Sequence, residues 1–412
     1  MSLRPSRRPT STAARAGVAI AAALALSACA GAGAGAQPAP SVTASASEEA
    51  QPHGFVEGAA ELAEPQRLLA AVDAEGAVRL LDPVTEEVVE LGGVGAATHV
   101  ADDGRFLAVT TPDGVALVDT GVWTVDHGDH AHYYAAEPRI VGTLDAEGPV
   151  VLRSTESTTA VLAGDAALLL DRAALGQGEI VETARLEGLA PGGFAAPLGD
   201  GAVVAAPGAV EVRDADGVVT ASEPCTEPAG GIVTRVGAVV GCAEGAVLAV
   251  ETEAGADLER IDLPAGTDAA LRPSGLDMRP GRATAAAVAG DAGYWLLDTR
   301  ERSWTLVETD EPLVRVASVD DADGHVVGID AAGRVVVHDG AGAEIGTTDP
   351  VLADALADPV AAEALSLEVD ASRAYAPLAA DDAVLEIDYA DGARIARTLA
   401  VPSPLHLVEA GR

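Results

Sequence analysis

The sequence predicts an all-β protein, a single closed β-propeller of eight blades preceded by a disordered tether. Three observations predict this class. A strand-like unit recurs along the chain after residue 65, its copies are spaced at the length of one propeller blade, and no convincing amphipathic helix separates them. The remaining motifs then indicate where the protein acts and which residues carry its chemistry.

Each copy of the unit consists of a turn residue, a run of four or five mostly strand-forming residues, and an acid. The eight terminal acids are Asp82, Asp119, Asp171, Asp214, Glu251, Asp298, Asp339 and Asp388. Successive acids lie 37 to 52 residues apart, about 44 on average, which matches one blade. Further apolar runs flank several copies, as at 106–111 and 87–91, so each unit holds three or four strands. A seven-blade ring, in which the first and last copies share one blade, is the alternative.

The repeated acid is expected to have a structural role. Aspartate favours turns because its carboxylate accepts hydrogen bonds from nearby backbone N–H groups. We therefore do not assign the eight acids as metal ligands. A weakly helical stretch from Leu352 to Leu365 is expected to form a surface connection between units.

The first 28 residues have the composition of a secretory signal. A basic head with four arginines precedes an uncharged stretch from Ala16 to Leu26. The segment Leu26-Ser27-Ala28-Cys29 resembles the lipobox of bacterial lipoproteins, so Cys29 is expected to be lipidated; an ordinary cleavable signal is the alternative. Residues 29–52, rich in Ala, Gly, Pro and Ser, are expected to be a disordered tether. Residues 53–412 then form the propeller domain.

Charge and cysteine content limit the partners and the compartment. The formal charge is −39, or about −43 without the four signal arginines, and such a surface repels nucleic acid. No other window reaches the roughly 18 apolar residues of a membrane helix. We expect an extracytoplasmic monomer held to the membrane by its lipid anchor only. Cys225 and Cys242 end adjacent strand-like runs and are expected to form one disulfide at the scale of a hairpin.

The residues expected to carry chemistry lie in the longest spacing, between Asp119 and Asp171. His127, His130 and His132 fall within six residues there, out of eight histidines in the chain. Imidazole nitrogens suit zinc, copper or nickel, and four-coordinate zinc needs three or four such donors in a small volume. Histidines two residues apart on an extended segment point to the same side, and Gly128 lets the backbone fold the third donor toward them.

Other side chains near this cluster are candidates for supporting roles. Asp129 is a candidate ligand, and Asp126 either ligates or orients an imidazole. His53, at the start of the domain, is a candidate fourth donor. Three of the eleven aromatic residues flank the cluster and are expected to shield it and hold its loop: Trp123, Tyr133 and Tyr134. Four histidines lie in or beside strand runs and are expected to be packing or surface residues: His99, His325, His338 and His406.

The sequence has no nucleophile elbow, phosphate loop, His-Glu-x-x-His helix or dinucleotide fingerprint. No catalytic residue is therefore assigned, and we do not expect an enzyme. A metal-dependent hydrolase is one alternative, with Asp129 as its base. A protein-interaction propeller with incidental histidines is the other.

Three segments resemble the AztD-type zinc metallochaperones of bacteria. They are Trp123–Tyr134, with the pattern Trp-Thr-Val-Asp-His-Gly-Asp-His-x-His-Tyr-Tyr, then Pro52–Gly58 and Leu297–Trp304. A looser similarity extends over the chain after the tether. The resemblance implies a carrier that passes Zn(II) to the solute-binding protein of a zinc ABC importer. It also implies ligation by the three clustered histidines and, more weakly, by His53, the only histidine here where some relatives have a longer histidine-rich segment.

Overall fold

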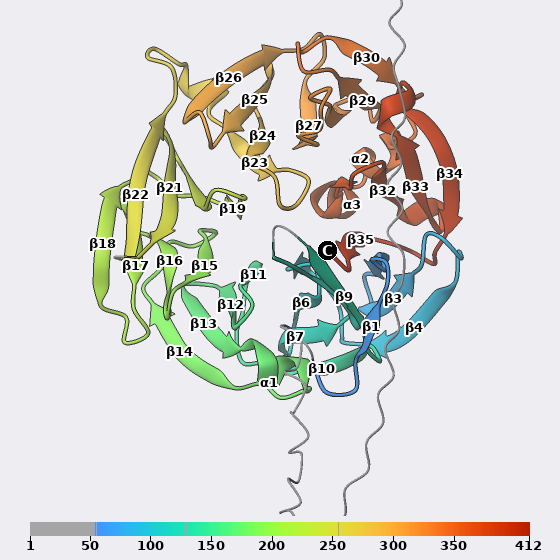
Figure 1. The fold of residues 1–412 in the computed structure, drawn as a ribbon. Coiled ribbons are helices and arrows are strands. Elements are labelled where there is room, and N and C mark those ends of the chain that lie inside the picture. Colours follow the sequence, from blue (N-terminus) through green and yellow to red (C-terminus); the bar gives the residue numbers. More distant parts are fainter. Residues whose placement is uncertain (1–53, 55, 128–129, 254) are drawn as a thin grey trace, which may run out of the picture. The chain divides into compact units, whose positions relative to one another are not determined.

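The computed structural model describes residues 54, 56–127, 130–253 and 255–412. Within them, short strands form eight four-stranded antiparallel sheets and one three-stranded sheet, so the all-β prediction is confirmed. Figure 1 shows the four-stranded sheets standing around a ring, with the first strand of each nearest its centre.

The last strand of the described chain completes the first sheet. From the centre of the ring to its rim, the first four sheets are β35 (His406–Ala410), β2 (Leu68–Val72), β3 (Ala77–Leu81), β4 (Val88–Gly93); β5 (His99–Asp102), β6 (Phe106–Thr111), β7 (Gly114–Asp119), β10 (Arg139–Leu144); β11 (Val150–Ser154), β12 (Thr158–Ala163), β13 (Ala166–Asp171), β14 (Glu182–Glu187); and β15 (Ala195–Leu198), β16 (Gly201–Ala206), β17 (Ala209–Arg213), β18 (Val219–Pro224).

Each of the other four sheets consists of four strands that are consecutive in sequence, again given from the centre of the ring to its rim. They are β19 (Gly231–Val233), β20 (Ala238–Cys242), β21 (Gly245–Thr252), β22 (Gly255–Asp262); β23 (Ser274–Asp277), β24 (Thr284–Val288), β25 (Gly293–Asp298), β26 (Ser303–Glu308); β27 (Leu313–Ser318), β28 (Val326–Asp330), β29 (Val335–His338), β30 (Glu344–Thr347); and β31 (Glu368–Val369), β32 (Ala374–Leu378), β33 (Ala383–Asp388), β34 (Arg394–Ala400).

The eight sequence units coincide with the third strands of these eight sheets: β3, β7, β13, β17, β21, β25, β29 and β33. Their acids act as predicted in most copies, because a carboxylate oxygen accepts hydrogen bonds from backbone N–H groups two to four residues further on. This holds for Asp82, Asp119, Asp171, Asp214, Asp298 and Asp339. Asp388 instead pairs with Arg394.

The hydrophobic core lies between the faces of neighbouring sheets. One apolar cluster joins the first and last sheets through Leu69 and Leu407 on one side and Tyr375 and Val384 on the other. In the first sheet, β2 pairs along its whole length with β35, from Leu68 opposite Ala410 to Val72 opposite His406. Backbone hydrogen bonds therefore join β2, the first strand of the ring in sequence, to the last strand of the chain. The first and last sequence units lie in different sheets.

The few helices lie in connections between strands. Helix α1 spans Arg172–Gly176 and joins β13 to β14 within one sheet. Helices α2 (Ala353–Ala357) and α3 (Pro359–Ala364) lie between β30 and β31 of neighbouring sheets, where the sequence is weakly helical. No described helix is both long and apolar enough to cross a bilayer.

A disulfide joins Cys225 and Cys242, whose Cα atoms are 5.3 Å apart. Since Cys225 follows β18 and Cys242 ends β20, the bond ties two sheets together and does not close a single hairpin.

Buried histidines make the stability of this fold dependent on pH. Burial, and to a smaller degree the nearby His99, lowers the pKa of His406 from 6.5 to about 4. As the pH falls through 6.5, His406 becomes protonated in the unfolded chain, whereas in the folded chain it stays neutral until about pH 4. This contribution to stability is therefore present above pH 6.5 and lost between pH 6.5 and 4.

We predict that replacing His406 with Leu flattens this pH dependence. Between pH 7 and 4.5, the melting temperature of the His406→Leu variant should fall by roughly 2–4 °C less than that of the wild type. Circular dichroism melts across this range measure the difference. Parallel curves for the two proteins would contradict the assignment.

Candidate metal centre

The longest spacing between sequence units contains an inserted hairpin. It consists of β8 (Val122–Asp126) and β9 (Ala131–Ala135). In sequence, the two strands follow β7 and precede β10, the third and fourth strands of the second sheet. A short N-terminal strand, β1 (Ala60–Leu62), pairs with β9, and the three form the three-stranded sheet. The hairpin therefore belongs to none of the four-stranded sheets of the ring.

The turn of this hairpin brings the three predicted histidines together. The backbone N–H of His127 donates to the carbonyl of His130 at 2.9 Å, which closes the turn. The ring centroids of His127, His130 and His132 lie 5.0 to 5.4 Å apart in all three pairs. One nitrogen from each ring lies within 4.8 Å of the other two. Among the described residues, this is the only group of three or more His, Cys, Asp or Glu side chains with such spacing.

The geometry of this cluster fits a tetrahedral zinc ion. With Zn–N bonds of about 2.0–2.1 Å, the nitrogens of a tetrahedral site lie roughly 3.3 Å apart. The three imidazoles need to approach one another by about 1.5 Å at most, which small side-chain rotations supply. His130 is exposed and the other two are half-buried, so the site lies at the surface, where an ion can enter and leave.

A carboxylate that the sequence analysis did not identify orients one of the imidazoles. Glu61 Oε1 lies 2.7 Å from His132 Nδ1. Glu61 pairs with Tyr134 across β1 and β9, so its side chain reaches diagonally to the residue two positions before Tyr134. When Nδ1 donates to this carboxylate, Nε2 of His132 is left as the basic nitrogen for a metal.

A row of stacked rings connects the histidines to the body of the protein. The His132 ring stacks on Tyr134 with centroids 6.2 Å apart, and Tyr134 stacks on Trp123 at 5.3 Å. Arg105 extends the row, because its guanidinium carbon lies 3.6 Å from the centroid of Trp123. Trp123 and Tyr134 are buried, and Tyr133 is half-buried. The aromatic residues thus hold the hairpin, as expected.

Arg105 in turn is fixed by a buried ion pair. Its Nε and Nη2 donate to the two carboxylate oxygens of Asp119 at 3.0 and 2.8 Å, and neither side chain is more than 3% exposed. Asp119, the repeated acid of the second unit, also accepts from the N–H of Gly121, where the chain turns into the hairpin. Gly121 has φ +78°, and a Cβ there would lie 2.4 Å from the Ala136 carbonyl oxygen. Glycine is therefore required at this turn.

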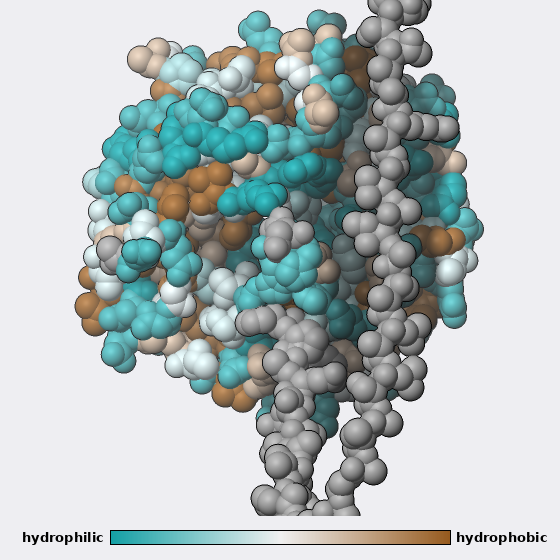
Figure 2. Space-filling model, viewed as in Figure 1, coloured by the Kyte–Doolittle hydropathy of each residue, from teal (hydrophilic) through white to brown (hydrophobic). Residues whose placement is uncertain are grey.

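Further contacts hold the hairpin to the segment before β1 and to the residue that follows β35. Trp123 Nε1 donates to the Gly54 carbonyl at 3.1 Å, and Thr124 Oγ1 donates to the Gly411 carbonyl at 2.8 Å. Between hairpin and ring lies a cavity of about 330 Å³, lined by Trp123 and Asp126 on one side and by Arg172 on the other. Viewed from this side, most of the visible surface is hydrophilic (Figure 2).

Not every candidate site residue falls within the described part of the chain. His53, Asp129 and Cys29 lie outside it. Asp126 is exposed at the end of β8. Of the four remaining histidines, His325, His338 and His406 are buried and His99 is half-buried, as expected of packing and surface residues.

Fold and site together define an all-β ring of sheets with a three-histidine candidate metal centre on an inserted hairpin. The chain matches no protein-family model and no curated protein sequence. Among solved structures it is similar to AztD from Citrobacter koseri, with a TM-score of 0.70, 18% identity, and coverage of 84% of this chain and 98% of that one. The apo form of the same protein gives 0.69 and 19% with the same coverage. At these identities the likeness shows a shared fold.

We predict that Glu61 tunes the metal affinity of the cluster. Glu61→Gln keeps the shape of the side chain but removes the charge that favours a basic Nε2 on His132. It should therefore weaken Zn(II) binding by about tenfold or more. Competition with a zinc-binding dye measures the change.

The matched control for this prediction is Glu64→Gln, which changes another exposed glutamate just beyond β1. Its zinc affinity should equal that of the wild type. An affinity of Glu61→Gln equal to that of the control would show that Glu61 does not act on the metal.

Proposed function

We propose that this protein is an exported Zn(II) carrier of the AztD type that passes the ion to the solute-binding protein of a zinc ABC importer. The observation that carries the proposal is the convergence of His127, His130 and His132 on one surface hairpin. The structural likeness to AztD supports it, as do the three sequence segments described above.

The surface position of the site favours a protein that carries and releases zinc rather than one that binds zinc permanently. Three imidazoles leave the fourth tetrahedral position for another donor. In the carrier that donor is His53 or Asp129 of the same chain, and a residue of the receiving protein replaces it during transfer. The exposed face of His130 provides the access that such an exchange needs.

The same geometry gives less support to hydrolysis. A zinc hydrolase needs a general base beside a metal-bound water. The carboxylate of Glu61, which contacts the cluster, is hydrogen-bonded to a ligand imidazole. It orients that ligand, which suits binding.

The rest of the proposal concerns location and architecture. We propose that residues 1–28 are a lipoprotein signal, that Cys29 is the lipidated first residue, and that residues 29–52 tether the domain 53–412 outside the membrane. The eight four-stranded sheets would be the blades of one closed propeller, with the β35–β2 pair as its closure. A monomer suffices, because each histidine of the cluster belongs to one chain.

The first test of this function is the zinc content of the purified mature chain. We expect one tightly bound Zn(II) per wild-type chain by elemental analysis. The double variant His130→Ala/His132→Ala should retain almost none, because it leaves one imidazole of the cluster. His99→Ala, which removes a histidine outside the cluster, is the control and should keep the wild-type content. Equal zinc in the double variant and wild type would refute the assignment.

The second test separates a carrier from a protein that only stores zinc. Zinc-loaded protein is mixed with increasing amounts of an apo zinc-specific solute-binding protein, and in parallel with a small chelator. We expect the transfer rate to rise with acceptor concentration beyond the limiting rate that the chelator reveals. A rate fixed at that limit would mean that zinc leaves by simple dissociation, which contradicts direct transfer.

A further inference from the structure

A second cavity, separate from the histidine cluster, lies where the inner strands of six sheets meet. Its volume is about 290 Å³. The residues that line it come from the ends of β5, β11, β19, β23 and β31 and from the segment after β35: Asp102, Arg153, Ile232, Asp277, Glu368 and Arg412. Each of these strands is the inner edge of its sheet, so this axial pocket is a product of the ring arrangement (Figure 1).

Three of the charged side chains in the axial pocket interact with one another. Arg412 forms an ion pair with Asp102, and its other terminal nitrogen lies 3.9 Å from Glu368. Glu368 also accepts a hydrogen bond from the backbone N–H of Glu409 at 3.3 Å. These partners satisfy Arg412 within the protein.

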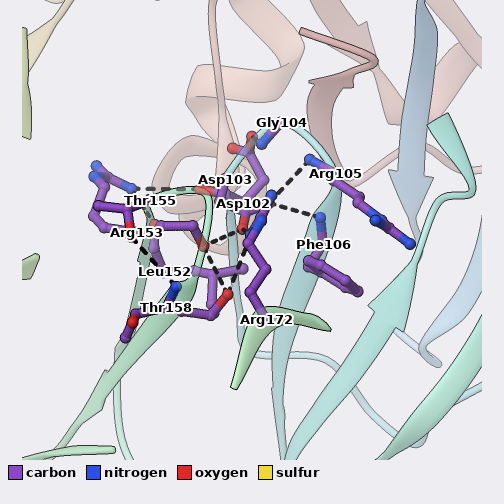
Figure 3. A network of polar contacts seen from close by, with 12 residues as sticks. Asp102, Asp103, Gly104, Arg105, Phe106, Leu152, Arg153, Thr155, Thr158 and Arg172 are labelled. Atoms are coloured by element: carbon purple, nitrogen blue, oxygen red, sulfur yellow. Dashed lines mark hydrogen bonds and ion pairs between the residues drawn. The ribbon is translucent and has the colours of Figure 1, made fainter. Parts of the chain in front are cut away.

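Arg153 and Asp277 remain without such a partner. Arg153 uses Nη1 to donate to the carbonyls of Leu152 and Asp102, the latter shown in Figure 3. Asp277 accepts one hydrogen bond, from the N–H of Met278 at 2.7 Å. Within the described chain, no carboxylate oxygen lies within 4.0 Å of the Arg153 guanidinium, and no cationic nitrogen lies within 4.0 Å of the Asp277 carboxylate. One cavity is thus lined by two half-buried, unpaired charges of opposite sign.

The rest of the lining consists of Asp103, Ser154 and four apolar residues, among them Ile232 and Met278. Ile232 and Met278 are buried, and Pro280 lies beside them. In small-molecule sites, apolar residues contact the ligand and charged groups fix its orientation, and both kinds of residue line this pocket. The pocket volume is close to the lower end of the range for such sites.

We propose that the axial pocket binds a zwitterionic α-amino acid with an aliphatic side chain. Its carboxylate pairs with Arg153, its ammonium pairs with Asp277, and its side chain packs on Ile232 and Met278. Guanidinium and carboxylate form strong bidentate hydrogen bonds, which gives Arg153 its part in recognition. This inference does not depend on the proposed zinc transport.

The charges of the pocket support this ligand. Burial raises the pKa of Asp277 to about 7, and the attraction of Arg412 and Arg153 offsets this only in part. Burial also lowers the pKa of Arg153. The protein therefore compensates the charged forms of Asp277 and Arg153 only in part, and a ligand that carries both charges stabilises them further.

A metal ion fits the pocket less well. The three carboxylates Asp102, Asp277 and Glu368 do not place three ligand atoms within 4.8 Å of one another, a spacing that only the histidine cluster reaches in the described residues. An amino acid instead carries one carboxylate for Arg153 and one ammonium for Asp277.

Calorimetry on the full mature chain tests the proposal with three probes. L-Leucine carries both charges, 4-methylpentanoate lacks the ammonium, and 3-methylbutylamine lacks the carboxylate. We expect leucine to bind with a Kd of about 1 mM or tighter, and each single-charge analogue at least about tenfold more weakly. No heat with leucine at several times that concentration, or equal affinity for leucine and an analogue, would overturn the proposal.

Two charge-removing variants assign the partners. Asp277→Asn should bind leucine and 4-methylpentanoate equally, and Arg153→Gln should bind leucine and 3-methylbutylamine equally. Loss of folding does not produce this selective pattern, and the analogue series on the wild type remains decisive if either variant is unstable. Unchanged discrimination in both variants would overturn the assignment.

Controls separate this site from the histidine cluster. Asp216→Asn and Arg185→Gln make the same chemical changes at the surface and should bind leucine as the wild type does. The double variant His130→Ala/His132→Ala should lose zinc but keep leucine binding. Loss of leucine binding in that variant would contradict a separate axial site. Conversely, Asp277→Asn should keep the wild-type zinc content, and a loss of zinc there would also contradict the separation of the two sites.

Discussion

Each four-stranded sheet has apolar side chains on both faces, and this constraint shapes the rest of the structure. A sheet of this kind is stable only when both faces are covered, because exposed apolar area costs free energy in water. Here the neighbouring sheets provide the cover, and the cluster of Leu69, Tyr375 and Val384 does the same between the first and last sheets. The β35–β2 pairing then joins the last strand of the chain to the first strand of the ring in sequence.

The histidine hairpin is outside this arrangement and needs its own attachment. A two-stranded hairpin in water is at best marginally stable. Strand β1 adds a third strand, and the row from His132 through Tyr134 and Trp123 to Arg105 connects the hairpin to the ring. The histidines can therefore lie at the surface, where an ion has access, while β1 and the row of stacked side chains hold the backbone of their hairpin in place.

Two kinds of chemistry are thus separated on one scaffold. The hairpin presents imidazole nitrogens within 4.8 Å of one another, a spacing for one metal ion. The axial pocket presents Arg153 and Asp277 without an ion pair between them, and a zwitterion carries one partner for each. The axial pocket and the cavity beneath the hairpin share Asp103, Ser154 and Arg412 along their walls. Asp103 is fixed by the N–H groups of Arg105 and Phe106 and by Arg172 (Figure 3).

The sequence by itself determined the local features of this protein. Strand periodicity and turn residues located the eight third strands, and the close spacing of His127, His130 and His132 was enough to predict their convergence, because these depend on contacts within a few residues. Only the tertiary structure decided that Glu61 reaches His132, that Cys225 and Cys242 join two sheets, and that Arg153 and Asp277 share a pocket. These relations depend on how sheets far apart in sequence pack in space, and no local pattern encodes that packing.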